Sequence, residues 1–123
     1  MPETYTKEIH TSQCCFYFTC CHKIDDRVLI EAVHHNFPDA FELETSWESY
    51  IIGSRIHIDV EHLPQVMSPA QLDERLDELY RVGVNARAFA FDHHGVNVEF
   101  EFAEIRVECC HAWSLAELSP GSG

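Results

Sequence analysis

The chain has 123 residues, with 21 Asp and Glu against 8 Lys and Arg, which gives a formal net charge of −13. Hydrophobic residues make up 46% and charged residues 24%, which is ordinary globular usage and excludes a disordered acidic chain. Because the few basic residues are scattered, direct binding to nucleic acid is disfavoured. The sequence has neither an apolar run long enough for a membrane span nor a signal peptide, so we expect a cytoplasmic protein without membrane contact.

The length suits one α+β domain over residues 1–118. Residues 119–123, with the sequence SPGSG, read as a flexible tail or a remnant of cloning. The six cysteines come as three adjacent pairs, and without a signal peptide they predict reduced thiols rather than a disulfide framework.

The first predicted element is a central strand over residues 11–21, which is rich in aromatic and β-favouring side chains. A helix then begins after Asp25 or Asp26 and ends at Pro38, with Leu29 and Val33 at helical spacing. Residues 41–44 begin a second strand, which pairs through a turn at residues 46–49 with a third strand over residues 50–60. Gly53 predicts a bulge in that third strand.

The second helix has the strongest local signals. Ser68 is expected at the N-cap, Pro69 follows at the first helical position, and Gln71 completes a capping box. Leu76 and Leu79 lie on one apolar stripe, and Gly83 is expected to end the helix.

The remaining pattern predicts a hairpin, with residues 89–91 and 96–102 as strands and a turn at residues 92–95. The apolar phase slips at Ala103 and Glu104 and resumes over residues 105–109, which one bulge or bend in the second of these strands would explain. The order β-α-β-β-α-β-β resembles a ferredoxin-like split β-α-β sandwich. That resemblance implies an α+β fold in which two helices cover one face of an antiparallel sheet, with an extra C-terminal strand.

Catalytic signatures are missing from the sequence. It contains no Gly-rich phosphate loop, no G-x-S-x-G and no H-E-x-x-H, so we expect a non-enzymatic protein without a cofactor. The alternative is a Cys/His site for zinc, formed if the first and last strands are neighbours. Its ligands would be Cys20, Cys21, His22, Cys110 and His111.

The acid excess suggests a binding function. Regularly spaced carboxylates on rigid elements can occupy a basic, nucleic-acid-binding groove of another protein. We therefore expect a small acidic protein that inhibits or neutralises a basic, nucleic-acid-handling partner, by nucleic-acid mimicry. In composition the chain resembles small anti-CRISPR and nuclease-immunity proteins. The expected partner-binding residues are Asp73, Glu74, Asp77, Glu78, Glu99, Glu101, Glu42 and Glu44.

Two further hypotheses remain open at this point. One is a small enzyme or ligand-binding domain with a pocket between the helices and the sheet. The other concerns oligomeric state, because one face of the first strand carries Cys15, Tyr17, Thr19 and Cys21 and is apolar enough to need cover. A C-terminal segment at residues 112–118 or a second copy of the chain in a homodimer would supply that cover.

Overall fold

The described residues form five strands and two helices in the order β-α-β-β-α-β-β. The computed structural model describes residues 6–51 and 53–113, so the predicted tail at residues 119–123 lies outside the described residues. The elements are β1 (Thr6–Cys20), α1 (Asp26–Asn36), β2 (Ala40–Tyr50), β3 (Gly53–Met67), α2 (Pro69–His94), β4 (Glu99–Arg106) and β5 (Cys109–Trp113).

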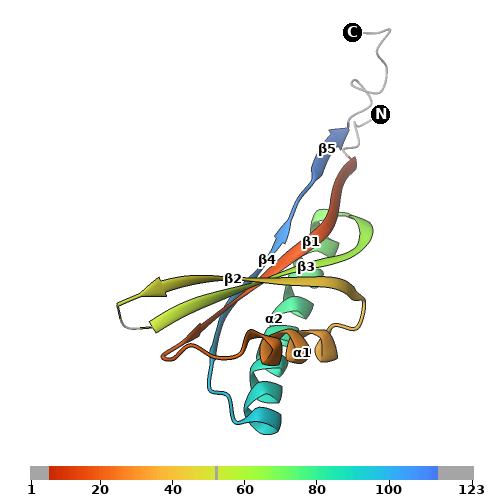
Figure 1. The fold of residues 1–123 in the computed structure, drawn as a ribbon. Coiled ribbons are helices and arrows are strands. Elements are labelled where there is room, and N and C mark those ends of the chain that lie inside the picture. The colour runs from red at the N-terminus through yellow and green to blue at the C-terminus, as the bar shows by residue number, and fades with distance from the viewer. Residues whose placement is uncertain (1–5, 52, 114–123) are drawn as a thin grey trace, which may run out of the picture.

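The strands pair in the order β2-β3-β1-β4, and each neighbouring pair is antiparallel. β1 is therefore a central strand, as predicted, although it begins five residues earlier than expected. β5 follows β4 on the same side of β1 and pairs with its first half, from Thr6 opposite Trp113 to His10 opposite Cys109. In Figure 1 these parts of β1 and β5 extend together beyond the helices.

Both helices cover the same face of the sheet (Figure 1), so the domain has two layers. Side chains that alternate along β1 and β3 point into this interface and are fully buried, as the period of a strand requires. They pack against one face of each helix in a single core. The largest members of the core are Phe16, Phe18, Ile56, Ile58, Val60, Leu29, Val33 and Leu79. This α+β architecture is compatible with a ferredoxin-like fold.

α1 follows its local signals closely. Asp25 is the N-cap, and its carboxylate accepts a hydrogen bond of 3.0 Å from the backbone N–H of Arg27. The helix ends at Asn36, just before Phe37 and Pro38, because a residue that precedes proline avoids the helical region. Leu29, Ala32 and Val33 form its buried face.

α2 begins as predicted but ends 11 residues later, because its last residue is His94 and not Gly83. The capping box is present, with Ser68 accepting from the backbone of Gln71 and the Gln71 side chain accepting from the backbone of Ser68. Gly95, with φ of 65°, supplies the left-handed C-cap. The predicted hairpin over residues 89–102 is therefore wrong, since residues 89–94 are helical.

The β2–β3 hairpin turns later than expected. The predicted turn at residues 46–49 is wrong, because these residues continue β2 and pair with β3. Gly53 opens β3 opposite Tyr50 with φ of 156°, and it does not form an interior bulge. A Cβ at this position would lie 2.6 Å from the carbonyl oxygen of Cys20, so the close approach of two backbones requires glycine here.

The bulge of β4 lies at Glu101, two residues before the predicted slip at Ala103 and Glu104. Tyr17 pairs with Phe102 and Phe18 with Phe100, which leaves Glu101 as the extra residue. The bulge reverses the phase of the strand. Phe100 therefore lies on the helix side with Phe18, while Phe102 stacks on Tyr17 on the opposite side of the sheet.

Candidate functional site

In the described part of the chain, the face of the sheet opposite the helices is left uncovered (Figure 1). We call it the open face. The register aligns its side chains in rows across the strands, such as Glu44, Asp59 and Cys15. Acidic side chains dominate the surface, with seven carboxylates against two arginines and one histidine. The carboxylates are Glu42, Glu44, Glu48, Asp59, Glu61, Glu101 and Glu104, and the basic residues are Arg55, His57 and Arg106.

Aromatic rings lie at the centre of the open face. The ring of Tyr17 stacks on Phe102 at a centroid distance of 4.2 Å and lies 4.6 Å from the ring of His57. Its hydroxyl donates a hydrogen bond of 2.6 Å to Glu104. Burial and this carboxylate both raise the pKa of Tyr17, so the phenol stays protonated and holds Glu104 in place.

Both arginines of the open face already have carboxylate partners. Arg55 donates from Nε and Nη2 to the two oxygens of Glu101, at 2.7 and 3.0 Å. It also lies 3.8 Å from Glu48, whose pKa is lowered chiefly by the hydrogen bond that it accepts from Tyr50. Arg106 donates to Asp59 at 3.1 Å.

The remaining acids of this face gather at one end of the β2–β3 pair. Glu42 lies opposite Glu61, and Glu44 lies opposite Asp59, so carboxylates face carboxylates across the ladder. Directly opposed like charges destabilise a sheet. Among the residues that the structure describes, Glu42, Glu44 and Glu61 have no cationic partner. Their negative charge is therefore available to a binding partner.

The eight predicted partner-binding acids do not form one surface. Glu42, Glu44 and Glu101 belong to the open face, whereas Glu99 is bonded to Arg87 of α2. The other four are exposed on α2, in the opposite layer of the domain: Asp73, Glu74, Asp77 and Glu78. β2 and β4 are moreover opposite edges of the four-strand order.

The predicted partner-binding set omits four acids of the open face. The alternation of Asp59 and Glu61 with Ile58 and Val60 marks them as the solvated side of a strand, but it does not connect them with Glu42 and Glu44. Glu48 was assigned to a turn that does not exist. The side of the sheet on which Glu104 lies depends on the bulge at Glu101, and the sequence pattern predicted that bulge two residues later.

The first and last strands are neighbours, as the zinc hypothesis requires, but their antiparallel register does not bring the predicted ligands together. Cys20, Cys21 and His22 lie at the end of β1, whereas Cys110 pairs with Ile9 near its beginning. Ile9 lies about 36 Å from Cys20, judged from the rise per residue of a β-strand. The backbone positions of Cys110 and His111, opposite Ile9 and Glu8, are enough to separate the two halves of the predicted site. Within the described residues, no group of three or more His, Cys, Asp or Glu could hold a metal ion.

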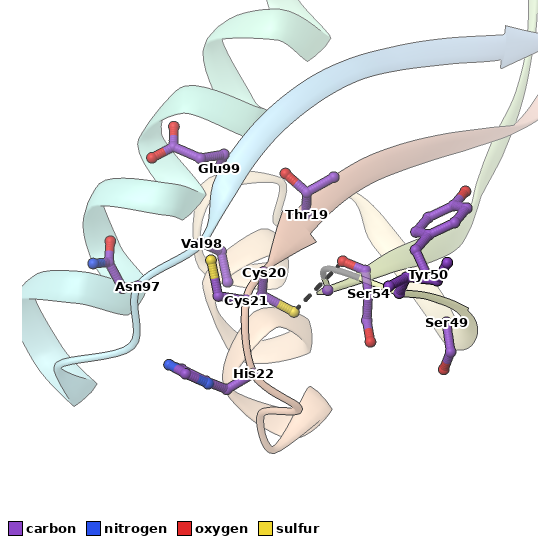
Figure 2. Close-up of a pocket in the computed structure, with 12 residues that line it drawn as sticks. Thr19, Cys20, Cys21, His22, Ser49, Tyr50, Ser54, Asn97, Val98 and Glu99 are labelled. Atoms are coloured by element: carbon purple, nitrogen blue, oxygen red, sulfur yellow. Dashed lines mark hydrogen bonds between the residues drawn. The ribbon is translucent and has the colours of Figure 1, made fainter.

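Cys20, Cys21 and His22 instead line a cavity of about 1150 Å³ at the end of the sheet (Figure 2). Its walls come from the end of β1, the β2–β3 turn and the start of β4, including Tyr50 and Val98. The thiol of Cys20 points toward Ser54, whose carbonyl oxygen lies 3.8 Å away. This cavity lies beyond the end of the helix–sheet interface, and the pocket was expected within that interface.

The described thiols differ sharply in accessibility. Cys14, Cys15 and Cys20 are buried and Cys21 is exposed, and all four are free. Burial raises the pKa of both Cys14 and Cys15 to about 12 and raises the pKa of Cys20. Cys14 and Cys20 belong to the apolar core, and Cys15 is buried on the open-face side of β1, so none of the three is an accessible nucleophile.

This difference predicts the outcome of thiol labelling at pH 8 with Ellman's reagent. In protein with Cys109 and Cys110 replaced by serine, we expect Cys21 to react rapidly and the other three thiols to react only after unfolding in guanidinium. With a pKa of about 12, the thiolate fraction of Cys14 or Cys15 at pH 8 is about 10⁻⁴. Rapid labelling of a second thiol would contradict the burial described here, and Cys21→Ser should remove the fast phase.

The fold and the open face together define an α+β domain with an acidic, uncovered antiparallel sheet. Comparison of the chain with known protein families, with curated proteins and with solved structures finds no match. In the described part of the chain, neither helix combines the length and apolar character needed to cross a membrane.

Proposed function

We propose that the protein is a non-enzymatic binding protein whose open face occupies the basic surface of a nucleic-acid-handling protein. The supporting observation is the excess of five negative charges on the open face, where both arginines are already paired with carboxylates. Such a face repels phosphates and attracts clustered Lys and Arg over long range. The action would be inhibition, as in anti-CRISPR or nuclease-immunity proteins.

The open face combines charge with order. Arg55 and Arg106 hold Glu101 and Asp59 in fixed positions, so a partner would spend little conformational entropy in ordering them. The acids project from neighbouring strands about 4.8 Å apart, which is a rigid spacing that flexible loops do not provide. This regularity supports nucleic-acid mimicry as the mode of binding.

Apolar groups accompany the acids, as expected of a protein interface. Phe41, next to Glu42, is 60% exposed, and Leu63 is 68% exposed. Both lie at the same end of the β2–β3 ladder, because Ala40 pairs with His62 there. Tyr17 and Phe102 supply a stacked aromatic pair at the centre. A basic partner that also presents apolar side chains fits this arrangement.

The fold proposed for this binding protein is the ferredoxin-like split β-α-β sandwich. The strand order β2-β3-β1-β4, with β1 and β3 in the centre and both helices on one face, supports it. Free thiols at four described positions support a reducing, cytoplasmic location.

The test compares charge reversals that change net charge equally on two surfaces. Affinity capture from the native cell, with mass spectrometry, identifies the partner, and binding of the purified partner is then measured at increasing salt. We expect Glu42→Lys with Glu44→Lys to weaken binding at least about tenfold. The matched control, Glu74→Lys with Glu78→Lys on α2, should bind nearly as well as the wild type. Added salt should weaken wild-type binding, and duplex DNA should compete for the partner.

Two results would contradict the proposal. One is binding that is indifferent both to salt and to the Glu42 and Glu44 reversals. The other is a captured partner that carries no basic surface and does not bind nucleic acid.

Binding of a small ligand is the second candidate function, favoured by the cavity at the end of the sheet (Figure 2). Its volume of about 1150 Å³ suits a drug-sized molecule, and Cys21 lies in its wall. A ligand there would slow the labelling of the Cys21 thiol.

A further inference from the structure

α2 carries a straight row of exposed side chains that the described part of the chain does not cover. We call it the α2 stripe: its members follow one another at alternating intervals of four and three residues, which keeps them on one side of a helix. Three of them are large and apolar, with exposed fractions of 40% for Tyr80, 55% for Val84 and 56% for Phe91. The stripe consists of Asp73, Asp77, Tyr80, Val84, Arg87 and Phe91.

The α2 stripe lies beside β4, which is one of the two edge strands in the order β2-β3-β1-β4. Tyr80 meets the ring of Phe100 edge-on at 5.6 Å. Arg87 donates to the carbonyl oxygen of Val98 at 3.0 Å and to Glu99 at 3.3 Å. These contacts hold the two side chains in fixed orientations at the border of the domain. β4 itself is a poor edge for further pairing, because the bulge at Glu101 and its glutamates protect it. A partner at this border would therefore meet the helix and not extend the sheet.

The positions of the stripe residues along α2 are symmetric about Val82. An antiparallel copy of α2, related by a two-fold axis at that point, would place Tyr80 opposite Val84. It would also place Asp77 opposite Arg87. A parallel copy would instead place aspartate against aspartate and arginine against arginine. The same axis places Asp73 opposite Phe91 at the two ends of the stripe. The pairing of Asp77 with Arg87 thus favours the antiparallel, self-complementary arrangement.

We propose that the α2 stripe is a homodimer interface in which α2 packs against α2 of a second copy. The open face is a poor alternative for self-association, because two surfaces with an excess of five negative charges would meet. Cys15 lies on the face of β1 that was expected to need cover by residues 112–118 or by a second copy, and it is already fully buried within one chain. Residues 114–118 of that segment lie outside the described residues. The inference is independent of the proposed binding function, and it leaves both open faces of the dimer free.

Sedimentation velocity and light scattering of the full chain test the proposal. The mass should rise from 14.2 kDa toward twice that value as protein concentration increases. Val84→Glu and Phe91→Glu should each raise the dimer dissociation constant at least about tenfold. Leu63→Glu, which places the same charge on an equally exposed apolar site of β3, should leave it unchanged.

Charge variants test the orientation of the two helices. Asp77→Arg opposes two arginines in the antiparallel pair and should weaken the dimer, whereas Asp39→Arg, with the same change in net charge, should not. Circular dichroism confirms that each variant is folded. A chain that stays monomeric at millimolar concentration would overturn the proposal. A dimer that survives Val84→Glu and Phe91→Glu, or that Leu63→Glu weakens equally, would also overturn it.

Discussion

Phe16→Ala is expected to lower the free energy of unfolding by about 3–5 kcal/mol. The Phe16 ring is fully buried between the sheet and the helices, where it meets Phe37 edge-on at 6.4 Å and Phe100 at 6.5 Å. Truncation removes its buried area and leaves a cavity that these neighbours cannot fill by small movements. Urea unfolding followed by circular dichroism measures the loss.

Phe41→Ala is the matched control, because the same side chain is 60% exposed there. We expect a change within about 0.5 kcal/mol. A loss for Phe16→Ala no larger than that of the control would contradict the core described here. Should Phe16→Ala not fold, Phe16→Leu keeps most of the volume and should show an intermediate loss.

Gly83→Ala is expected to destabilise the protein, although helix propensity alone predicts a gain of about 1 kcal/mol. A Cβ at Gly83 would lie 2.3 Å from Cε1 and Cζ of Phe100. That ring cannot move freely, since it also contacts Phe18 at 5.4 Å and Tyr80 at 5.6 Å. We expect overpacking to outweigh propensity and to give a net loss of about 1–3 kcal/mol. Thermal and urea unfolding determine the sign.

A double-mutant cycle with Phe100→Leu tests the cause. The smaller side chain should reduce the cost of Gly83→Ala, which would give a coupling energy between the two positions. Gly95→Ala serves as the control without steric contact, because nothing lies within 4 Å of its added Cβ and only its φ of 65° opposes the substitution. A stabilising Gly83→Ala would show that helix and sheet are not packed this closely.

The wrong prediction that α2 ends at Gly83 shows where reasoning from local sequence fails. A glycine after an apolar stripe is typical of a helix end. In this protein Gly83 lies inside α2, where the lack of a side chain lets the helix pack closely against the ring of Phe100. The apolar residues that follow, including Phe89 and Ala90, fit the helical period as well as they fit a strand. Only the position of Phe100 on β4, 17 residues away, distinguishes the two readings.

The candidate site was predictable only in part, because local sequence shows which side of a strand a residue occupies but not which strands lie beside it. Alternation along β2 marks Glu42 and Glu44 as one side of a strand, and this needs only local sequence. Their placement beside Asp59 and Glu61 depends on the hairpin register, and Glu101 joins Arg55 only through the order of the strands. The acids of α2 are exposed as predicted, but they lie in the other layer. The total charge could therefore be read from the sequence, while its division between two surfaces could not.

By itself, the sequence determined both helix N-termini, the central position of β1 and most of the apolar core, but it misplaced the last two strands. These features depend on short-range periodicity and on capping by nearby side chains. The tertiary structure decided the ends of α2 and β2, the bulge at Glu101, the separation of Cys20 from Cys110 and the composition of the open face. Each of these depends on contacts between residues far apart in the chain, where packing and register outweigh local propensity.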